Sequence, residues 1–159
     1  MKLLRALIGV SLFVIASVAH AGFDEGMAAY EKGDYKTAVA EWRPIAEQGY
    51  AGAQFNLGAM YGRGQGVPQD YKEAMKWYRK AAEQDDAVAQ NNLGRMYGNG
   101  EGVPQDDKEA YAWFSVAAAN GFSESSKNRD MAAETLTPSQ LEQGQALAKK
   151  YFEKYQPKP

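Results

Sequence analysis

The chain has no cysteine, one histidine and no long hydrophobic run beyond its first residues. The absence of cysteine excludes the disulfide framework on which many small exported domains depend, and it also excludes a lipid anchor attached through cysteine. The longest apolar stretch, residues 7–18, is shorter than the roughly 20 residues that a membrane-spanning helix requires. Packing of apolar side chains must therefore stabilise the fold.

Residues 1–21 have the pattern of a secretory signal peptide. Lys2 and Arg5 form a basic start, residues 7–18 form the apolar stretch, and residues 19–21 form a small-x-small cleavage site. We therefore expect cleavage after position 21. The product would be periplasmic or secreted, not lipidated, and without a membrane span.

The only histidine, His20, lies within this signal. After cleavage the chain would have neither histidine nor cysteine, which removes the Ser-His-Asp and Cys-His nucleophile pairs and the common zinc ligands. We expect no catalytic residue, no metal and no cofactor. Carboxylates, lysine and tyrosine are what would remain for catalysis.

Positive charge is also scarce. The chain has 18 basic and 20 acidic side chains, and loss of Lys2 and Arg5 leaves 18 − 2 = 16 basic residues and a net charge of −4. Binding to a nucleic-acid backbone needs concentrated lysine and arginine. We therefore expect no nucleic-acid partner.

An internal repeat of 36 residues dominates the rest of the chain. Residues 35–70 align with residues 71–106 without a gap, and 22 of the 36 positions are identical. In each copy, residues such as Ala53, Leu57 and Tyr61 recur at i, i+4 and i+8, which places them on one face of a helix. Each unit is thus expected to be a helical hairpin that stacks on its neighbours.

The repeat, with its capping residues and its glycines at helix ends, predicts eight helices and no strand. The fold class is an all-α solenoid, a right-handed superhelix of four antiparallel helical hairpins. Gly58 and Gly94 lie in the middle of predicted helices, which indicates close approach of a second helix. The predicted helices cover residues 24–32, 35–48, 51–62, 70–84, 87–98, 106–120, 123–135 and 138–154.

The repeated motif resembles a known family. Ala-Gln-x-x-Leu-Gly-x-x-Tyr-x-x-Gly-x-Gly-Val, followed by Lys-x-Ala and Trp-Tyr-x-x-Ala-Ala, is similar to the Sel-one-like repeat, a relative of the tetratricopeptide repeat. Residues 53–82 and 89–118 carry the match. The resemblance implies a scaffold that holds a protein or peptide partner, with exported bacterial members linked to the cell envelope and to host interaction. Its oligomeric state and the identity of the partner stay open.

The resemblance extends more weakly to both sides. The expected organisation is a signal peptide over residues 1–21 and one domain over 22–159. Within this domain we expect repeats at about 23–50, 51–86 and 87–122, followed by capping helices over 123–154. Residues 123–135 keep helical character but lose the repeat signature.

Three other patterns have structural interpretations. The glycine-rich segments 62–68 and 98–104 resemble phosphate loops, but no strand precedes them, so positive φ in a turn explains them better. Trp42, Trp77 and Trp113 could stack on sugars, but the helical spacing of Trp77 and Trp113 favours the core. Three carboxylate pairs could serve in glycoside cleavage, but we interpret them as helix caps and dipole partners. These pairs are Asp24-Glu25, Asp85-Asp86 and Asp106-Asp107.

Two functions follow as hypotheses. The first is a non-enzymatic scaffold for protein or peptide binding, and the alternative is a carboxylate-dependent envelope hydrolase or glycan-binding protein. For the scaffold, stepping by four along the first helix of each hairpin gives three columns away from the core, which would stack into one binding stripe. The columns are Phe23, Met27 and Glu31; Phe55, Ala59 and Arg63; and Asn91, Arg95 and Asn99.

Overall fold

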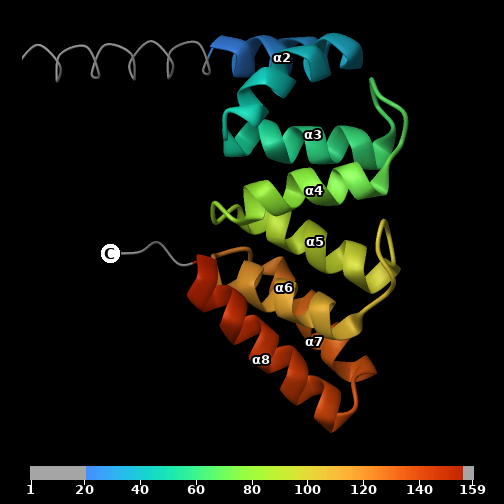
Figure 1. Ribbon diagram of the computed structural model, residues 1–159, viewed down its shortest axis with the longest axis vertical. Helices are drawn as coiled ribbons and strands as arrows, with labels where there is room; N and C mark the ends of the chain where they lie inside the picture. The colour runs from blue at the N-terminus through green and yellow to red at the C-terminus, as the bar shows by residue number, and fades with distance from the viewer. Residues whose placement is uncertain (1–20, 156–159) are drawn as a thin grey trace, which may run out of the picture.

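A computed structural model describes residues 21–155, and all regular elements within that range are helices. The first helix occupies residues 21–31, and the others follow one another down a single stack (Figure 1). Bounds of the seven labelled helices agree with the predicted ranges to within two residues. They are α2 (Tyr35–Glu47), α3 (Ala51–Arg63), α4 (Tyr71–Ala82), α5 (Ala87–Asn99), α6 (Asp107–Ala119), α7 (Glu124–Thr135) and α8 (Pro138–Tyr155).

Aspartate caps begin four of these helices, since the side chain of Asp34 also accepts a hydrogen bond from the backbone N–H of Thr37 at the start of α2. Asp70, Asp86 and Asp106 each accept hydrogen bonds from the backbone N–H groups of the second and third helical residues, which otherwise lack partners. This confirms the capping interpretation of two of the carboxylate pairs, Asp85-Asp86 and Asp106-Asp107. The third pair, Asp24-Glu25, lies inside the helix of residues 21–31, so the expectation that it begins a helix is wrong.

The glycine-rich segments end the first helix of a hairpin. Gly64 and Gly100 adopt the left-handed conformation, with φ of 67° and 68°, and their N–H groups bond to the carbonyl of Met60 and to those of Met96 and Tyr97. A side chain at either position would be strained. The predicted role of these loops as turns is confirmed.

Within each of the first three hairpins, a glycine on the first helix faces an aromatic ring on the second. A Cβ atom on Gly58 would lie 2.7 Å from the ring of Tyr78, and one on Gly94 would lie 2.6 Å from the ring of Phe114. Gly26 faces Trp42 in the same way. Absence of a side chain therefore lets the two helices approach, as the repeated glycines predicted.

Successive hairpins are joined through apolar cores and buried glutamines. Trp77 packs with the first core cluster and Trp113 with the second, and only 3% and 0% of their surfaces are exposed, which confirms their assignment to the core. Gln90 is fully buried. Its amide donates to the carbonyl oxygen of Ala82 at 3.0 Å, and its side-chain oxygen accepts from Asn120 at 3.0 Å. The bond to Ala82 ties the third unit to the second, and Gln54 ties the second unit to the first through the carbonyl oxygen of Ala46 at 2.9 Å.

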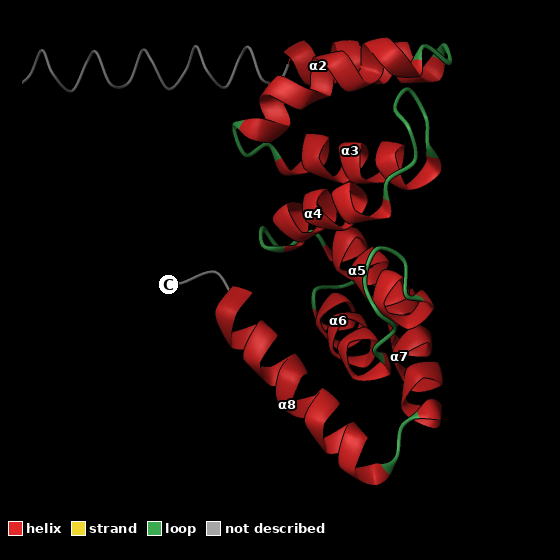
Figure 2. Cartoon of the chain, turned by 45° about the vertical axis from the view of Figure 1, so that its right-hand side comes forward, coloured by secondary structure: helices red, strands yellow, loops and turns green. Residues whose placement is uncertain are grey.

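The last two helices do not form the fourth hairpin that the sequence predicted. Both α7 and α8 pack on α6, and they diverge from each other like the arms of a V (Figure 2). α8 lies along α6, where Tyr151 stacks on Trp113 with ring centroids 4.7 Å apart and Gly144 fits against Tyr111. Aromatic stacking on Trp113 thus replaces packing against α7.

Candidate functional site

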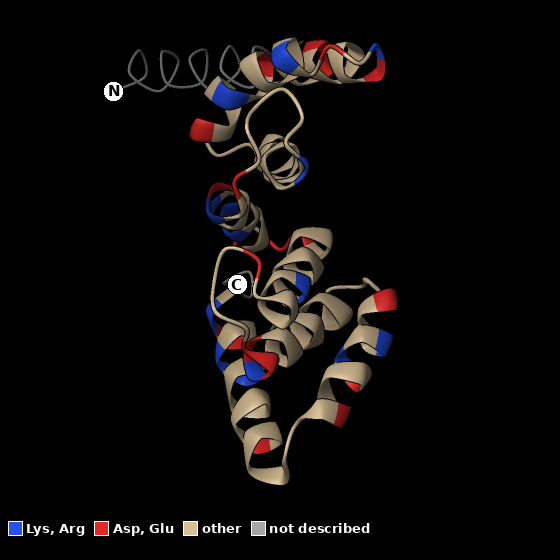
Figure 3. Ribbon diagram, turned by 90° about the vertical axis from the view of Figure 1, so that its right-hand side faces the viewer, with Lys and Arg blue, Asp and Glu red and all other residues tan. Residues whose placement is uncertain are grey.

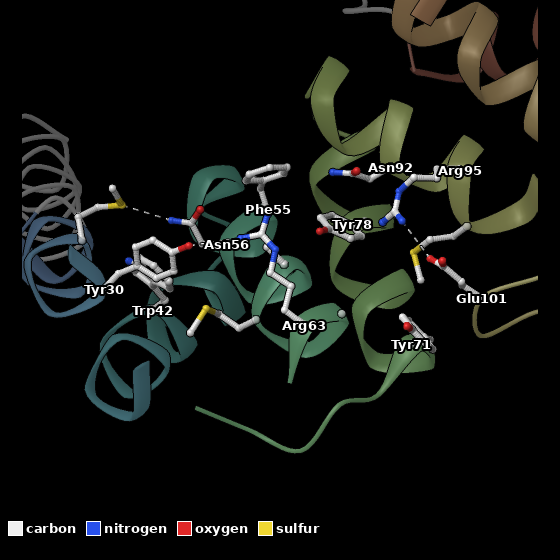
Figure 4. Close-up of a pocket in the computed structure, with 15 residues that line it drawn as sticks. Tyr30, Trp42, Phe55, Asn56, Arg63, Tyr71, Tyr78, Asn92, Arg95 and Glu101 are labelled. Carbon is white, nitrogen blue, oxygen red and sulfur yellow. Dashed lines mark hydrogen bonds and ion pairs between the residues drawn. The ribbon is translucent and has the colours of Figure 1, made fainter. Parts of the chain in front are cut away.

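The first three units enclose a groove of about 530 Å³ on one side of the stack. Residues 21–31, α2, α3, α4 and α5 all contribute to its lining, together with the loop that follows α5 (Figure 4). The groove therefore depends on the stacking of successive hairpins and belongs to no single unit.

Aromatic rings form much of the surface of this groove. Tyr30 packs against Trp42 with centroids 5.9 Å apart, and Phe55 packs against Tyr78 with centroids 5.7 Å apart. Tyr78 comes from a second helix and reaches the groove because Gly58 leaves room for its ring. Such a surface can take apolar side chains of a ligand.

Two asparagines occupy the same position in successive repeats. Asn56 of α3 and Asn92 of α5 are 36 residues apart in the sequence, and both line the groove. Asn56 makes one weak contact, from its amide nitrogen to the sulfur of Met27 at 3.7 Å. An amide side chain can donate and accept at once, so these two residues can bond to a peptide backbone.

The groove contains two guanidinium groups and one carboxylate. Arg95 forms an ion pair with Glu101 at 3.4 Å, and Arg63 donates to the hydroxyl of Tyr30 at 3.3 Å. Burial raises the pKa of the Tyr78 hydroxyl, and the nearby charges of Arg63 and Arg95 act in the opposite direction. The Tyr78 phenol is therefore protonated at neutral pH and able to donate a hydrogen bond.

The structure brings together five of the nine residues in the predicted stripe. These five line the groove: Met27, Phe55, Ala59, Arg63 and Arg95. The other four do not line it, and the role of all nine in partner binding stays a prediction. These other four are Phe23, Glu31, Asn91 and Asn99.

Packing accounts for two of these departures. Phe23 packs inward against Trp42 and Tyr50, with centroids 6.4 Å and 5.1 Å away. Asn91 accepts hydrogen bonds from Ser125 and Asn128 of α7. Asn91 thus bonds to α7, although it occupies the same position in its repeat as Phe55.

The side chains of Glu31 and Asn99 are exposed to solvent outside the groove. Asn99 donates a hydrogen bond to Glu101 at 3.0 Å. Arg63 and Asn99 occupy the same position in successive repeats. Arg63 lines the groove, whereas Asn99 bonds to the loop that follows α5.

Ten of the fifteen lining residues were absent from the predicted stripe, and among them are Asn56, Asn92 and Tyr78. The two asparagines carried a usable signal, because they repeat at a polar position beside the apolar face of the first helix. Tyr78 carried none, since a ring at its position is expected to be buried completely. Its ring lies between α3 and α5, the first helices of two successive hairpins, and one part of it reaches the groove.

Other kinds of site have little support in the described part of the chain. Residues 21–155 contain no group of three acidic, histidine or cysteine residues that could hold a metal ion. None of the helices in the same range is both long and apolar enough to cross a membrane. Basic and acidic side chains are interspersed along the ribbon rather than gathered by sign (Figure 3).

Comparison with known proteins agrees with the geometry. The family model described as Sel1 repeat matches residues 51–86 and 87–122. Two solved structures are similar in fold and sequence. A protective antigen present in uropathogenic Escherichia coli strains, displaying an SLR fold, has a TM-score of 0.82 and 38% identity over 86% of this chain and 30% of its own. A Sel1 repeat protein from Oxalobacter formigenes has a TM-score of 0.64 and 35% identity over 74% of this chain and 48% of its own.

The chain thus spans less than half the length of either of these structures. No curated protein matches it significantly. The similar proteins share the helical stack and the repeat with this chain.

Proposed function

The chain belongs to the Sel1 repeat proteins through residues 51–122, and from that membership we propose that it is a scaffold that binds an extended segment of a protein partner. Sel1 repeats generally bind protein partners, and their solenoids generally act as non-catalytic scaffolds. The groove of the first three units is the proposed site. The partner would lie across the first helices of successive hairpins.

A single observation carries this proposal, namely that three successive units build one groove with repeated amides above an aromatic surface. Asn56 and Asn92 can bond to the N–H and C=O groups of an extended peptide, whatever its sequence. Phe55 and Tyr78 offer apolar contact for its side chains. Backbone bonding with side-chain pockets beside it is a common mode of peptide recognition.

The chemistry of the groove favours binding over hydrolysis. Glu101 is the one carboxylate in its lining, and this carboxylate pairs with Arg95. General acid and base catalysis of glycoside cleavage needs two carboxylates on either side of the bond. A scaffold therefore fits the groove better than the alternative of an envelope hydrolase.

Affinity capture with variants tests the proposal. The wild-type chain and Asn56→Ala/Asn92→Ala would be used to capture proteins from an envelope extract, and a captured partner would then be purified and titrated against both. We expect the double variant to bind at least about tenfold more weakly, since each backbone hydrogen bond contributes about 1 kcal/mol.

The matched control is Lys149→Gln, on an exposed part of α8 far along the chain from the groove. It should bind like the wild type, and all three proteins should show the same helical signal and melting temperature. Equal binding by the asparagine variant would remove the groove as the site. Turnover of peptidoglycan by the purified chain would favour the hydrolase instead.

We also propose that the chain is exported and acts in the periplasm or outside the cell, without a lipid anchor. The basic start, apolar stretch and cleavage site of residues 1–21 support this proposal, and residues 1–20 lie outside the described part of the structure. Amino-terminal sequencing of the envelope form should begin at Gly22, and a protein that begins at Met1 would contradict cleavage.

A further inference from the structure

The groove carries more positive than negative charge, although the whole chain has a formal net charge of −2. Its lining contains two arginines and one glutamate. Arg95 is paired with Glu101, whereas none of the ion pairs among residues 21–155 includes Arg63. Arg63 is therefore a cation whose one side-chain partner there is the neutral hydroxyl of Tyr30.

The unpaired guanidinium lies next to a second donor. Figure 4 shows the ring of Tyr78 between Arg63 and Arg95, and both arginines act on the pKa of its hydroxyl. The hydroxyl groups of Tyr30, Tyr61 and Tyr97 accept hydrogen bonds from arginines, but none of the described residues bonds to that of Tyr78. A charged donor and a neutral donor thus face the same part of the groove.

Glu101 shows which kind of acceptor suits this region. Its carboxylate lies 3.4 Å from Arg95, and its side chain is 21% exposed, so the groove already holds one carboxylate beside a guanidinium. Arg63 has a guanidinium of the same kind with no carboxylate. A ligand carboxylate there would make charge-assisted hydrogen bonds and would neutralise the excess charge of the groove.

The apolar surface next to Arg63 defines the rest of the ligand. Phe55 and Met27 line the groove on the side of α3 and of residues 21–31, and both are partly buried. Side chains two positions apart in an extended segment point to the same side and lie roughly 6–7 Å apart, so one can reach this surface while the other reaches Arg63.

We propose that the groove selects an acidic peptide segment, in which an aspartate or glutamate side chain binds Arg63 and Tyr78 while an apolar side chain two residues away packs on Phe55. This inference rests on the proposed function, because it assumes that a peptide occupies the groove. It adds the chemistry of the partner: a carboxylate two residues from an aromatic or aliphatic side chain.

Selection from a random peptide library displayed on phage tests this directly. The full chain would be immobilised, enriched peptides would be synthesised with a fluorescent label, and their binding would be measured by polarisation. We expect enrichment of aspartate or glutamate two positions away from an apolar residue. Replacing that acid by its amide, or making Arg63→Gln, should each weaken binding about tenfold, because a hydrogen bond to a charged group contributes about 1.5–3 kcal/mol.

A double-mutant cycle identifies the pair. If the acid binds Arg63, combining the two changes should weaken binding no further than either change alone. The amide peptide should therefore bind Arg63→Gln about as tightly as the acidic peptide does. Lys149→Gln removes one positive charge from an exposed site on α8 and should bind the acidic peptide like the wild type. Arg63 is exposed, so its variant should melt like the wild type.

The outcomes separate this inference from the proposed function. Two results would overturn the acidic preference and leave the groove as a peptide site. In the first, the enriched peptides contain no acid but lose binding to Phe55→Ala. In the second, acidic peptides bind Arg63→Gln as tightly as the wild type. Failure to enrich any peptide, or binding that is unchanged by Phe55→Ala, would overturn both.

Discussion

Two glycines in α5 allow a sharp test of how the hairpins pack. Gly94 and Gly98 lie in the same helix, and alanine at either position gains helix propensity of about 1 kcal/mol. Their surroundings differ. A Cβ on Gly98 would have its nearest neighbour, the Cβ of Ala110, at 3.6 Å, which is ordinary contact, whereas a Cβ on Gly94 would lie 2.6 Å from the Phe114 ring.

The expected energies have opposite sign. Gly98→Ala should raise the free energy of unfolding by up to about 1 kcal/mol, since it gains propensity without a clash. Gly94→Ala must move the Phe114 ring, of which 8% is exposed, or separate α5 from α6. Overpacking costs about 1–3 kcal/mol, so after the propensity gain this variant should lose about 1 kcal/mol. The two variants should then differ by about 2 kcal/mol.

Circular dichroism at 222 nm during thermal and urea unfolding measures this difference. For a domain of this size, about 2 kcal/mol corresponds to roughly 8 °C in Tm. The bulkier Gly94→Leu should be less stable than Gly94→Ala, although leucine also favours a helix. If Gly94→Ala proved as stable as Gly98→Ala, the ring of Phe114 would not limit the approach of the two helices, and our explanation of the repeated glycine would be refuted.

Further predictions concern a turn, a buried amide and a phenol. Gly100→Ala, at φ of 68°, should lower the free energy of unfolding by about 1 kcal/mol through backbone strain, and an unchanged urea midpoint would contradict this. Gln90→Leu leaves the amide of Asn120 without its acceptor and should cost about 1–3 kcal/mol, which the same titration would show. Burial and the hydrogen bond to Glu109 raise the pKa of Tyr151, so its stabilising contribution is present below pH 10 and declines as pH rises further; Tyr151→Phe should lose stability less steeply than the wild type above pH 10.

Much of the fold was predictable because its signals are local or repeated. Each of these signals determines the structure of only the few residues around it. Capping aspartates, left-handed glycines and helically spaced apolar residues can therefore be recognised without knowledge of the whole fold. The pairing of Gly58 with Tyr78 and of Gly94 with Phe114 was only half visible. The glycines indicated a close approach, but the sequence did not show which ring would occupy the space.

The end of the solenoid was not predictable in this way. Local signals identified α7 and α8 correctly as helices, and their order suggested a fourth hairpin. Their placement depends on Trp113, since the rings of Tyr151 and Tyr155 stack on it and hold α8 against α6. Competition between two packing partners is a tertiary property, and it is decided by which contact buries more apolar surface.

The amino-acid sequence by itself determined the helices, their turns, the repeat and the family, because these depend on spacing along the chain. Only the tertiary structure decided which side chains meet in the groove. Phe55 and Asn91 occupy the same repeat position, yet Phe55 lines the groove and Asn91 bonds to α7. Each unit meets different neighbours as the solenoid proceeds, so identical spacing leads to different surroundings.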